Sequence, residues 1–300
     1  MTAEIFRCTA AAEARGEPLF GTASFVRRWL LLEQPGSWGR DALSDSKLPK
    51  PFAQELHRRT RALGIRVILI RRGVRTSAPR RQCYFVRTSV DDSYQAHLWL
   101  DDVTDLLDVD LSPLAQGGAI AQAEAQSDPL FLVCTHGRHD ACCSIRGNQV
   151  SRVACAQVDR DAWECSHIGG DRFAANVVCF PHGLYYGRVG AGDVTRLMDA
   201  YSEGLLELGH YRGRCAYPFS VQAAEYFVRR ERGITRVDDV TLLSFTRRED
   251  GVRATFALPG GERLEAAVAV AKGAAHRLTC TATGANPIPS YSLVSISAPG

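Results

Sequence analysis

The sequence has no long hydrophobic run and almost no lysine, and each absence excludes a class of protein. Its longest apolar stretches, Trp29–Leu32 and Val67–Ile70, have the length of strands and are too short to span a membrane. The first fifteen residues contain no apolar run of signal-peptide length, so we expect a cytoplasmic protein. Only Lys47, Lys50 and Lys272 are lysines among 36 basic residues, and the net charge is +3. So small a positive excess argues against nucleic acid or a membrane surface as a partner.

The sequence also lacks any Cys-x-x-Cys motif. Thiol–disulfide oxidoreductases usually carry this motif at a helix start, because the attacking thiolate needs a resolving partner. The adjacent Cys142 and Cys143 would form only a strained vicinal disulfide, so oxidoreductase chemistry is disfavoured. Ten cysteines in 300 residues are also too few for a disulfide scaffold.

The cysteines fall into two groups. Six stand apart in apolar surroundings and are predicted to be buried structural thiols: Cys8, Cys83, Cys155, Cys179, Cys215 and Cys280. The other four lie within 32 residues, together with three histidines: Cys134, Cys142, Cys143, Cys165, His136, His139 and His167. We expect the chemistry of the protein in this second group.

The order of predicted elements indicates an α/β fold in three parts. Residues 1–115 form an N-terminal α/β unit, with a predicted helix that ends at Gly64 and the strands Phe25–Glu33, Ile65–Ile70, Gln82–Arg87 and Gln95–Leu100. Residues 115–128 read as a linker. Residues 116–233 have the order of a thioredoxin-like core, with strands at Leu130–Cys134 and Trp163–Ser166, a hairpin at 173–189, and helices at Asp140–Val158 and Asp193–Ser202. The first part has a similar order, although no residue-level repeat is visible.

The third part, residues 234–300, is predicted to be a small antiparallel β region after a helix at Phe219–Arg232. Three alternating strands with glycine turns between them indicate this sheet: Val240–Thr246, Val252–Leu258 and Leu264–Val270. The tail, rich in Ser, Pro and Ala, carries no signal for a regular element.

The spacing of thiols and imidazoles in the second part indicates a metal site. Cys134 ends a predicted strand and Cys143 begins a predicted helix, whose free N–H groups stabilise thiolates. His167 and Asp171 follow about thirty residues later, and Gly169-Gly170 between them lets the backbone pass close to a bulky ligand. Simpler roles remain open: a buried hydrophobe for Cys142, loop capping or exposure to solvent for His136 and His139, and a turn for His182. Structural zinc usually has cysteines two to four apart, so the nine-residue spacing here favours a wider object such as a two-iron cluster.

At these residues the chain resembles the sucrase/ferredoxin-like family of thioredoxin-like [2Fe–2S] ferredoxins, which includes the fungal actin-patches-distal proteins. The resemblance covers roughly residues 15–232. Its motifs are Val-Cys134-Thr-His-Gly-Arg-His-Asp140-Ala-Cys-Cys143, Trp163-Glu-Cys-Ser-His167-Ile-Gly-Gly-Asp-Arg172-Phe-Ala-Ala-Asn176, Pro181-His-Gly-Leu-Tyr-Tyr-Gly-Arg188 and Tyr211-Arg-Gly-Arg-Cys215.

The resemblance implies a [2Fe–2S] cluster held by Cys134, Cys143 and His167, with Asp171 at the position where the family has a second histidine. Either the cluster is bound by two cysteines, one histidine and one aspartate, or Cys142, Cys165 or His139 replaces Asp171, or the cluster has been lost. The sucrase part of the family name implies nothing for this chain, because no acid–base carboxylate pair is apparent and no catalytic residue is assigned.

We therefore expect a cytoplasmic iron–sulfur protein that carries electrons or responds to redox state, more a carrier than an enzyme. Its partner would be a reductase or an electron acceptor protein. Arg138 and Arg172 either form a docking rim for an acidic reductase or are simply solvated charges. The alternative is a zinc-binding or metal-free scaffold on the same fold that binds a partner through its C-terminal sheet.

Overall fold

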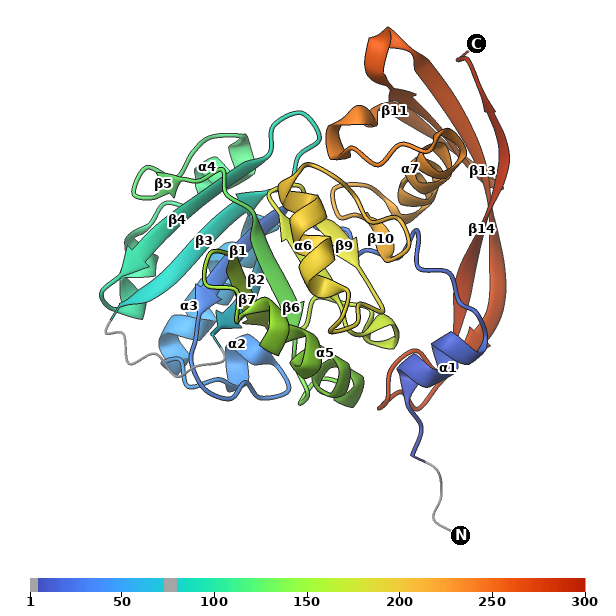
Figure 1. The fold of residues 1–300 in the computed structure, drawn as a ribbon. Coiled ribbons are helices and arrows are strands. Elements are labelled where there is room, and N and C mark those ends of the chain that lie inside the picture. The colour runs from blue at the N-terminus through green and yellow to red at the C-terminus, as the bar shows by residue number, and fades with distance from the viewer. Residues whose placement is uncertain (1–4, 73–79, 300) are drawn as a thin grey trace.

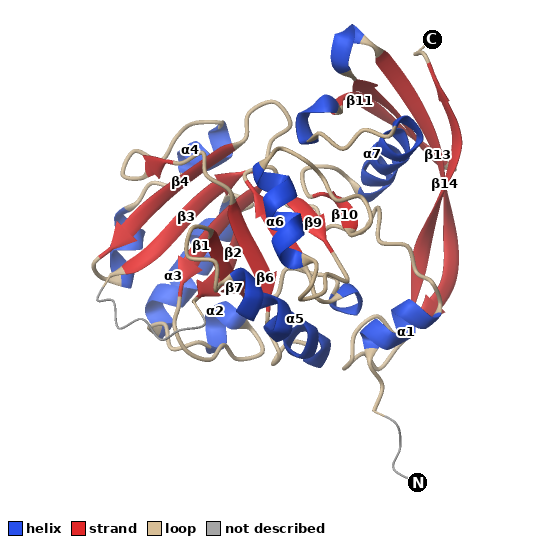
Figure 2. Cartoon of the chain, viewed as in Figure 1, coloured by secondary structure: helices blue, strands red, loops and turns tan. Residues whose placement is uncertain are grey.

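The large sheet dominates the architecture. The computed structural model describes residues 5–72 and 80–299. Within these residues, ten strands form one large sheet and four form a small antiparallel sheet near the C-terminus (Figure 1). Within the described residues, helices and strands are mixed in the part of the chain that forms the large sheet, and mainly strands follow at the C-terminus (Figure 2). The predicted α/β class, with a small antiparallel β region at the end, is confirmed.

The first half of the large sheet comes from the N-terminal segment. Its strands run in the order β2–β1–β3–β4, with β1 and β2 parallel and the other pairs antiparallel. Gly64 takes up a left-handed conformation just after the helix, as the sequence predicts. The elements are β1 (Arg28–Glu33), α2 (Ala42–Asp45), α3 (Lys50–Ala62), β2 (Arg66–Arg71), β3 (Arg81–Arg87) and β4 (Tyr94–Leu100).

The second half repeats this topology in the order β7–β6–β8–β9, with β6 and β7 parallel. This is the strand order of a thioredoxin-like core. Between β7 and β8 the described chain has a loop with a single 3₁₀ turn, η2, and this loop carries His167 and Asp171. The elements are β6 (Leu130–Cys134), α5 (Ala141–Ala154), β7 (Asp161–Cys165), η2 (Asp171–Phe173), β8 (Val177–Phe180), β9 (Leu184–Tyr186) and α6 (Val194–Ser202).

The two halves join edge to edge, because β2 pairs antiparallel with β7. Residues 1–115 and 116–233, predicted as separate units, thus contribute strands to one sheet. The sheet curls strongly: the rings of Trp29 in β1 and Phe180 in β8 are 5.2 Å apart, although three strands separate them. Its inner face forms one apolar core, while α3 covers the outside of the first half and α5 and α6 cover the outside of the second.

The C-terminal region contains a strand that the sequence did not predict. The tail expected to carry no regular element forms β14, which pairs with a long β13 from Glu265–Ser297 to His276–Asn286. This hairpin runs along one side of the molecule from α7 to α1 (Figure 1). The elements are α1 (Cys8–Ala14), β10 (Tyr211–Arg214), α7 (Phe219–Arg232), η3 (Val237–Asp239), β11 (Thr241–Arg248), β12 (Gly251–Ala257), η4 (Pro259–Gly261), β13 (Arg263–His276) and β14 (Asn286–Ser297).

Two further predictions need correction. The segment 115–128, read as a linker, contains the end of α4 (Ser112–Gln116) and the short strand β5 (Glu124–Ala125), which pairs with β4 after η1 (Val103–Asp108). The helix predicted to reach Val158 ends at Ala154, and Val158 is fully exposed rather than part of an apolar face. In the part of the chain that the structure describes, no helix combines the length and apolar character needed to cross a membrane.

Candidate metal centre

The predicted site lies where β6, β7 and α5 meet. Because β6 and β7 are parallel neighbours, their carboxyl ends lie at the same edge of the sheet. Cys134 is the last residue of β6, Cys143 lies in the first turn of α5, and the loop after β7 supplies His167 and Asp171. Three separate segments therefore deliver the four predicted ligands to one place.

A glycine allows α5 to start so close to β6. A Cβ atom at residue 147 would lie 2.0 Å from the carbonyl oxygen of Cys134, so only glycine fits against that backbone. Cys143 lies one helical turn before Gly147 and is thereby held beside Cys134.

The structure brings together all four predicted ligands. The ligating atoms of Cys134, Cys143 and His167 lie within 4.8 Å of one another. Oδ1 of Asp171 is 3.0 Å from Sγ of Cys143 and 3.0 Å from Nδ1 of His167. Cys134, Cys143 and Asp171 are buried, whereas the His167 side chain is 22% exposed. The site is closed to solvent except on its histidine side.

His139, one of the alternative ligands, also belongs to this cluster. Its ring stacks on the ring of His167 with centroids 3.7 Å apart, and its Nε2 atom is 4.0 Å from Oδ2 of Asp171. His139, His167 and Asp171 form a second set of donors within 4.8 Å. The two stacked imidazoles form the exposed edge of the site.

His136 has a structural role instead. Its Nε2 atom donates to the carbonyl oxygen of Gly39 at 2.7 Å, and its Nδ1 atom accepts from the backbone N–H of His167 at 3.2 Å. With both ring nitrogens engaged, His136 has no free lone pair for a metal. It ties the His167 loop to the first half of the sheet, which confirms the loop-capping interpretation.

Of the two other alternative ligands, Cys165 lies against Cys134 at the edge of the site, whereas Cys142 faces away from it. Cys165 lies opposite Cys134 at the end of β7, and burial raises the pKa of the Cys165 thiol well above its ordinary value. The Cys142 side chain contacts Cys280 and Thr9, away from the predicted site. Donation from Cys8 lowers the pKa of Cys142 to about 5. The prediction that Cys8 and Cys280 stand apart in apolar surroundings is therefore wrong, because both lie beside Cys142 and Asp140.

The predicted site carries a chain of alternating charges. Interaction with the thiols of Cys143 and Cys165 keeps the pKa of Cys134 well below its ordinary value. Burial opposes the charge on His167, but the Asp171 carboxylate and the Cys134 thiolate outweigh it and raise the pKa of His167 to about 9. Burial likewise opposes ionisation of Asp171, yet the interaction with His167 leaves the pKa of Asp171 lowered. A protonated imidazole thus lies between two anions, where a metal cation would replace the proton.

The sequence interpretation did not assign a role to Arg212, which supports the ligand loop from behind. This buried side chain donates to the carbonyl oxygen of Gly169 at 3.0 Å and to Oδ1 of Asn176 at 2.8 Å. Gly170 has a φ of 81°, and a Cβ there would lie 2.3 Å from the Arg212 guanidinium. The glycine pair was expected to pass close to a ligand, but its close neighbours are Arg212 and Ser24. The signal for Arg212 was present in the motif Tyr211-Arg-Gly-Arg-Cys215.

The two arginines expected to form a docking rim differ in the structure. Arg172 donates to Glu17 at 2.7 Å and is only 15% exposed, so its charge is already paired. Arg138 is exposed and directly precedes His139. Of the two, only Arg138 has an exposed side chain.

Comparison with known proteins decides the family. The model of the family described as "Sucrase/ferredoxin-like" matches residues 19–213, which contain all four predicted ligands. The chain belongs to the sucrase/ferredoxin-like family. No solved structure matches the chain.

Two curated relatives share part of this sequence, and both are named "Altered inheritance of mitochondria protein 32". The one from Meyerozyma guilliermondii is 31% identical over 98 residues, which cover 29% of this chain and 35% of that protein. The one from Candida glabrata is 24% identical over 141 residues, covering 42% of this chain and 40% of that protein. The chain therefore spans between a third and two fifths of the length of these relatives.

Proposed function

We propose that this family member binds a [2Fe–2S] cluster through Cys134, Cys143, His167 and Asp171 and acts as an electron carrier or redox-responsive protein. The observation that carries the proposal is the convergence of these four donors, from three segments, inside the region that matches the family. When bound, such a cluster takes up and releases one electron at a time.

The donor set fits this cofactor. Thiolates and imidazole are the ligands that iron–sulfur centres use, and a carboxylate is an acceptable harder ligand for iron. Nδ1 of His167 is buried without a partner in hydrogen-bond geometry, although Asp171 lies 3.0 Å away. Once the imidazole gives up its proton, this buried ring nitrogen has a lone pair to offer to a metal, which then takes the place of the proton.

The surrounding residues would shape how the cluster exchanges electrons. Burial of Cys134, Cys143 and Asp171 keeps water from that side of the cluster, which is one of the factors that set its potential. The stacked rings of His139 and His167 form the accessible side, so we propose that a redox partner docks there. The exposed Arg138, which directly precedes His139 in the sequence, suits an acidic reductase or electron acceptor. We also propose a cytoplasmic location, where reducing conditions keep thiols such as these free.

One zinc ion at the same residues is the second candidate. The donor atoms of Cys134, Cys143 and His167 lie within 4.8 Å of one another, and the bond lengths of tetrahedral zinc place its donors about 3.3–3.8 Å apart. This closeness favours a single ion, whereas the family favours the cluster. The zinc candidate would make the protein a scaffold rather than an electron carrier.

Spectroscopy separates the two candidates. The full chain would be purified without oxygen, and its visible absorption and electron paramagnetic resonance spectra recorded before and after dithionite. We expect a reddish-brown protein whose colour bleaches on reduction while a paramagnetic signal appears. A colourless protein with no signal after reduction would overturn the cluster proposal.

A further inference from the structure

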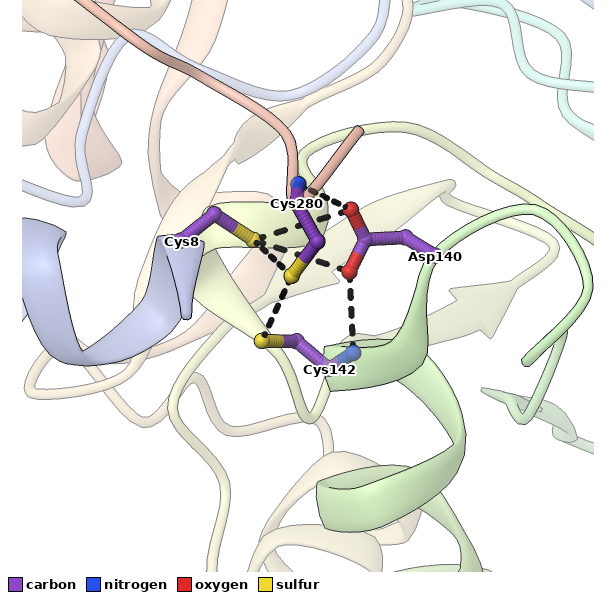
Figure 3. Close-up of side chains that lie close together, drawn as sticks. All are labelled: Cys8, Asp140, Cys142 and Cys280. Atoms are coloured by element: carbon purple, nitrogen blue, oxygen red, sulfur yellow. Dashed lines mark hydrogen bonds between the residues drawn. The ribbon is translucent and has the colours of Figure 1, made fainter. Parts of the chain in front are cut away.

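A second group of donors meets outside the predicted site. Cys8 at the start of α1, Asp140 and Cys142 at the start of α5, and Cys280 in the loop between β13 and β14 all point to one spot (Figure 3). Their ligating atoms lie within 4.8 Å of one another, although Cys8 and Cys280 are 272 residues apart in the sequence. The β13–β14 hairpin reaches down to α1 in Figure 1, and the loop between its strands carries Cys280.

The separations within this group match the edges of a metal tetrahedron. The sulfur of Cys280 is 3.4 Å from that of Cys142 and 3.6 Å from that of Cys8, and Sγ of Cys8 is 3.6 and 3.8 Å from the two Asp140 oxygens. Zinc bond lengths of about 2.3 Å to sulfur and about 2.1 Å to oxygen give tetrahedral edges of about 3.8 and about 3.6 Å. The side chains need only small movements to surround one ion.

Neighbouring groups fix the orientation of these donors. The Asp140 carboxylate accepts from the backbone N–H of Cys142 at 2.8 Å and from that of Cys280 at 2.6 Å. Thr9 donates its hydroxyl to the sulfur of Cys142 at 3.2 Å. Such outer hydrogen bonds hold ligands in place around protein metals.

Its role as the N-cap of α5 is enough to explain the position of Asp140. That role does not explain why three thiols lie around the Asp140 carboxylate. A disulfide between any two of these cysteines would not account for the position of the third cysteine or of the carboxylate. Three soft sulfur donors and one carboxylate, with no place left open for a substrate, form the kind of closed set that binds structural zinc. We propose that Cys8, Asp140, Cys142 and Cys280 bind a structural zinc ion that fastens α1 and the β13–β14 hairpin to the start of α5.

The zinc content of variants tests this proposal, whatever metal the first site holds. Wild type would be compared with the double variant Cys8→Ser/Cys280→Ser and with the control Cys155→Ser, which removes a half-buried thiol elsewhere. We expect the double variant to lose about one zinc per chain and the control to lose none. Iron content should not change, because neither replaced residue is among the four ligands of the first site. Equal zinc in all three proteins would overturn the proposal.

Proteolysis of wild-type protein gives a readout that does not depend on folding of the variant. Arg277 lies in the hairpin loop three residues before Cys280 and is exposed, so trypsin can cut there. A chelator that removes zinc should release the loop and speed this cut about tenfold or more, and added zinc should restore protection. Cleavage at an unchanged rate would contradict the proposal. So would a disulfide among the three thiols in protein alkylated during lysis.

Discussion

The sulfur of Cys143 lies 3.0 Å from a carboxylate oxygen of Asp171, at the position where the resemblance to the family implies a second histidine. The contact links the thiol at the start of α5 to the loop after β7. It therefore places Asp171 among the predicted ligands of the first site. If Asp171 is a ligand, its negative charge disfavours adding an electron to the cluster.

The variant Asp171→His tests that role. A neutral imidazole in place of the carboxylate should raise the reduction potential, in the direction that histidine ligation moves Rieske centres relative to all-cysteine ones. It should also make the potential depend more steeply on pH above neutrality, because the ligand gains a titratable ring nitrogen. Spectroscopic redox titration over a range of pH measures both effects. An unchanged potential and an unchanged slope would show that Asp171 is only a turn residue.

Single replacements of the adjacent cysteines should have opposite effects on the two metals. Cys143 faces Asp171, whereas Cys142 faces Cys280. We therefore expect Cys143→Ser to lose iron and keep zinc, and Cys142→Ser to lose zinc and keep iron. Elemental analysis of both proteins is the measurement. Loss of iron in Cys142→Ser with full iron in Cys143→Ser would contradict the assignment of the two side chains.

Replacement of Gly147 by alanine should weaken the fold and the site together. Alanine favours a helix by about 1 kcal/mol over glycine. The new Cβ would, however, lie 2.0 Å from the carbonyl oxygen of Cys134, which belongs to the backbone and cannot easily move. Relieving this overlap should lower the free energy of unfolding by more than that gain, by about 1–3 kcal/mol or above. We expect a net loss in the free energy of unfolding, measured by denaturant titration, and less bound iron.

The variant Gly192→Ala is the control for that experiment, since a Cβ there meets no atom within 4 Å. It should change neither stability nor iron content appreciably. A Gly147→Ala protein as stable as wild type would show that α5 can move away from β6 at no cost.

Acid should destabilise the protein partly through His182. Its ring lies 2.7 Å from the Tyr201 hydroxyl, and burial together with the charge of Arg214 lowers the pKa of His182 to about 4. In the unfolded chain the pKa of histidine is about 6.5. As pH falls from about 6.5 to about 4, the unfolded state takes up a proton that the folded state refuses. Stability should then fall by up to about 1.4 kcal/mol per pH unit from this group.

The variant His182→Asn removes this titrating group. The free energy of unfolding should then depend less on pH between about 4 and about 6.5. Denaturant titrations at several pH values compare the slopes of the two proteins, independently of any constant difference in stability. Parallel slopes would show that His182 is protonated in the folded protein as readily as in the unfolded one.

Local sequence patterns predicted much of the large sheet and the arrangement of the first site. The buried strand Leu130–Cys134 and the helix Phe219–Arg232 have the predicted ends, because apolar runs and a glycine cap mark them in the sequence. The four donors of the first site were predicted because strand and helix ends, together with the family motifs, place them near one another.

What could not be predicted depends on contacts between distant segments. β14 contains Pro287 and Pro289 and is largely exposed, so nothing local marks it as a strand; its register with β13 defines it. Cys8 and Cys280 looked isolated for the same reason, since only the β13–β14 hairpin brings them together. The curl of the sheet likewise depends on packing across strands, as between Trp29 and Phe180.

Metal and sulfide analysis of anaerobically purified protein tests the central claim most directly. The account predicts about two irons and about two acid-labile sulfides per chain in wild type, with both lost in Cys143→Ser. Wild-type protein that contains no iron or sulfide, or that holds zinc at the site of Cys134, Cys143, His167 and Asp171, would contradict it.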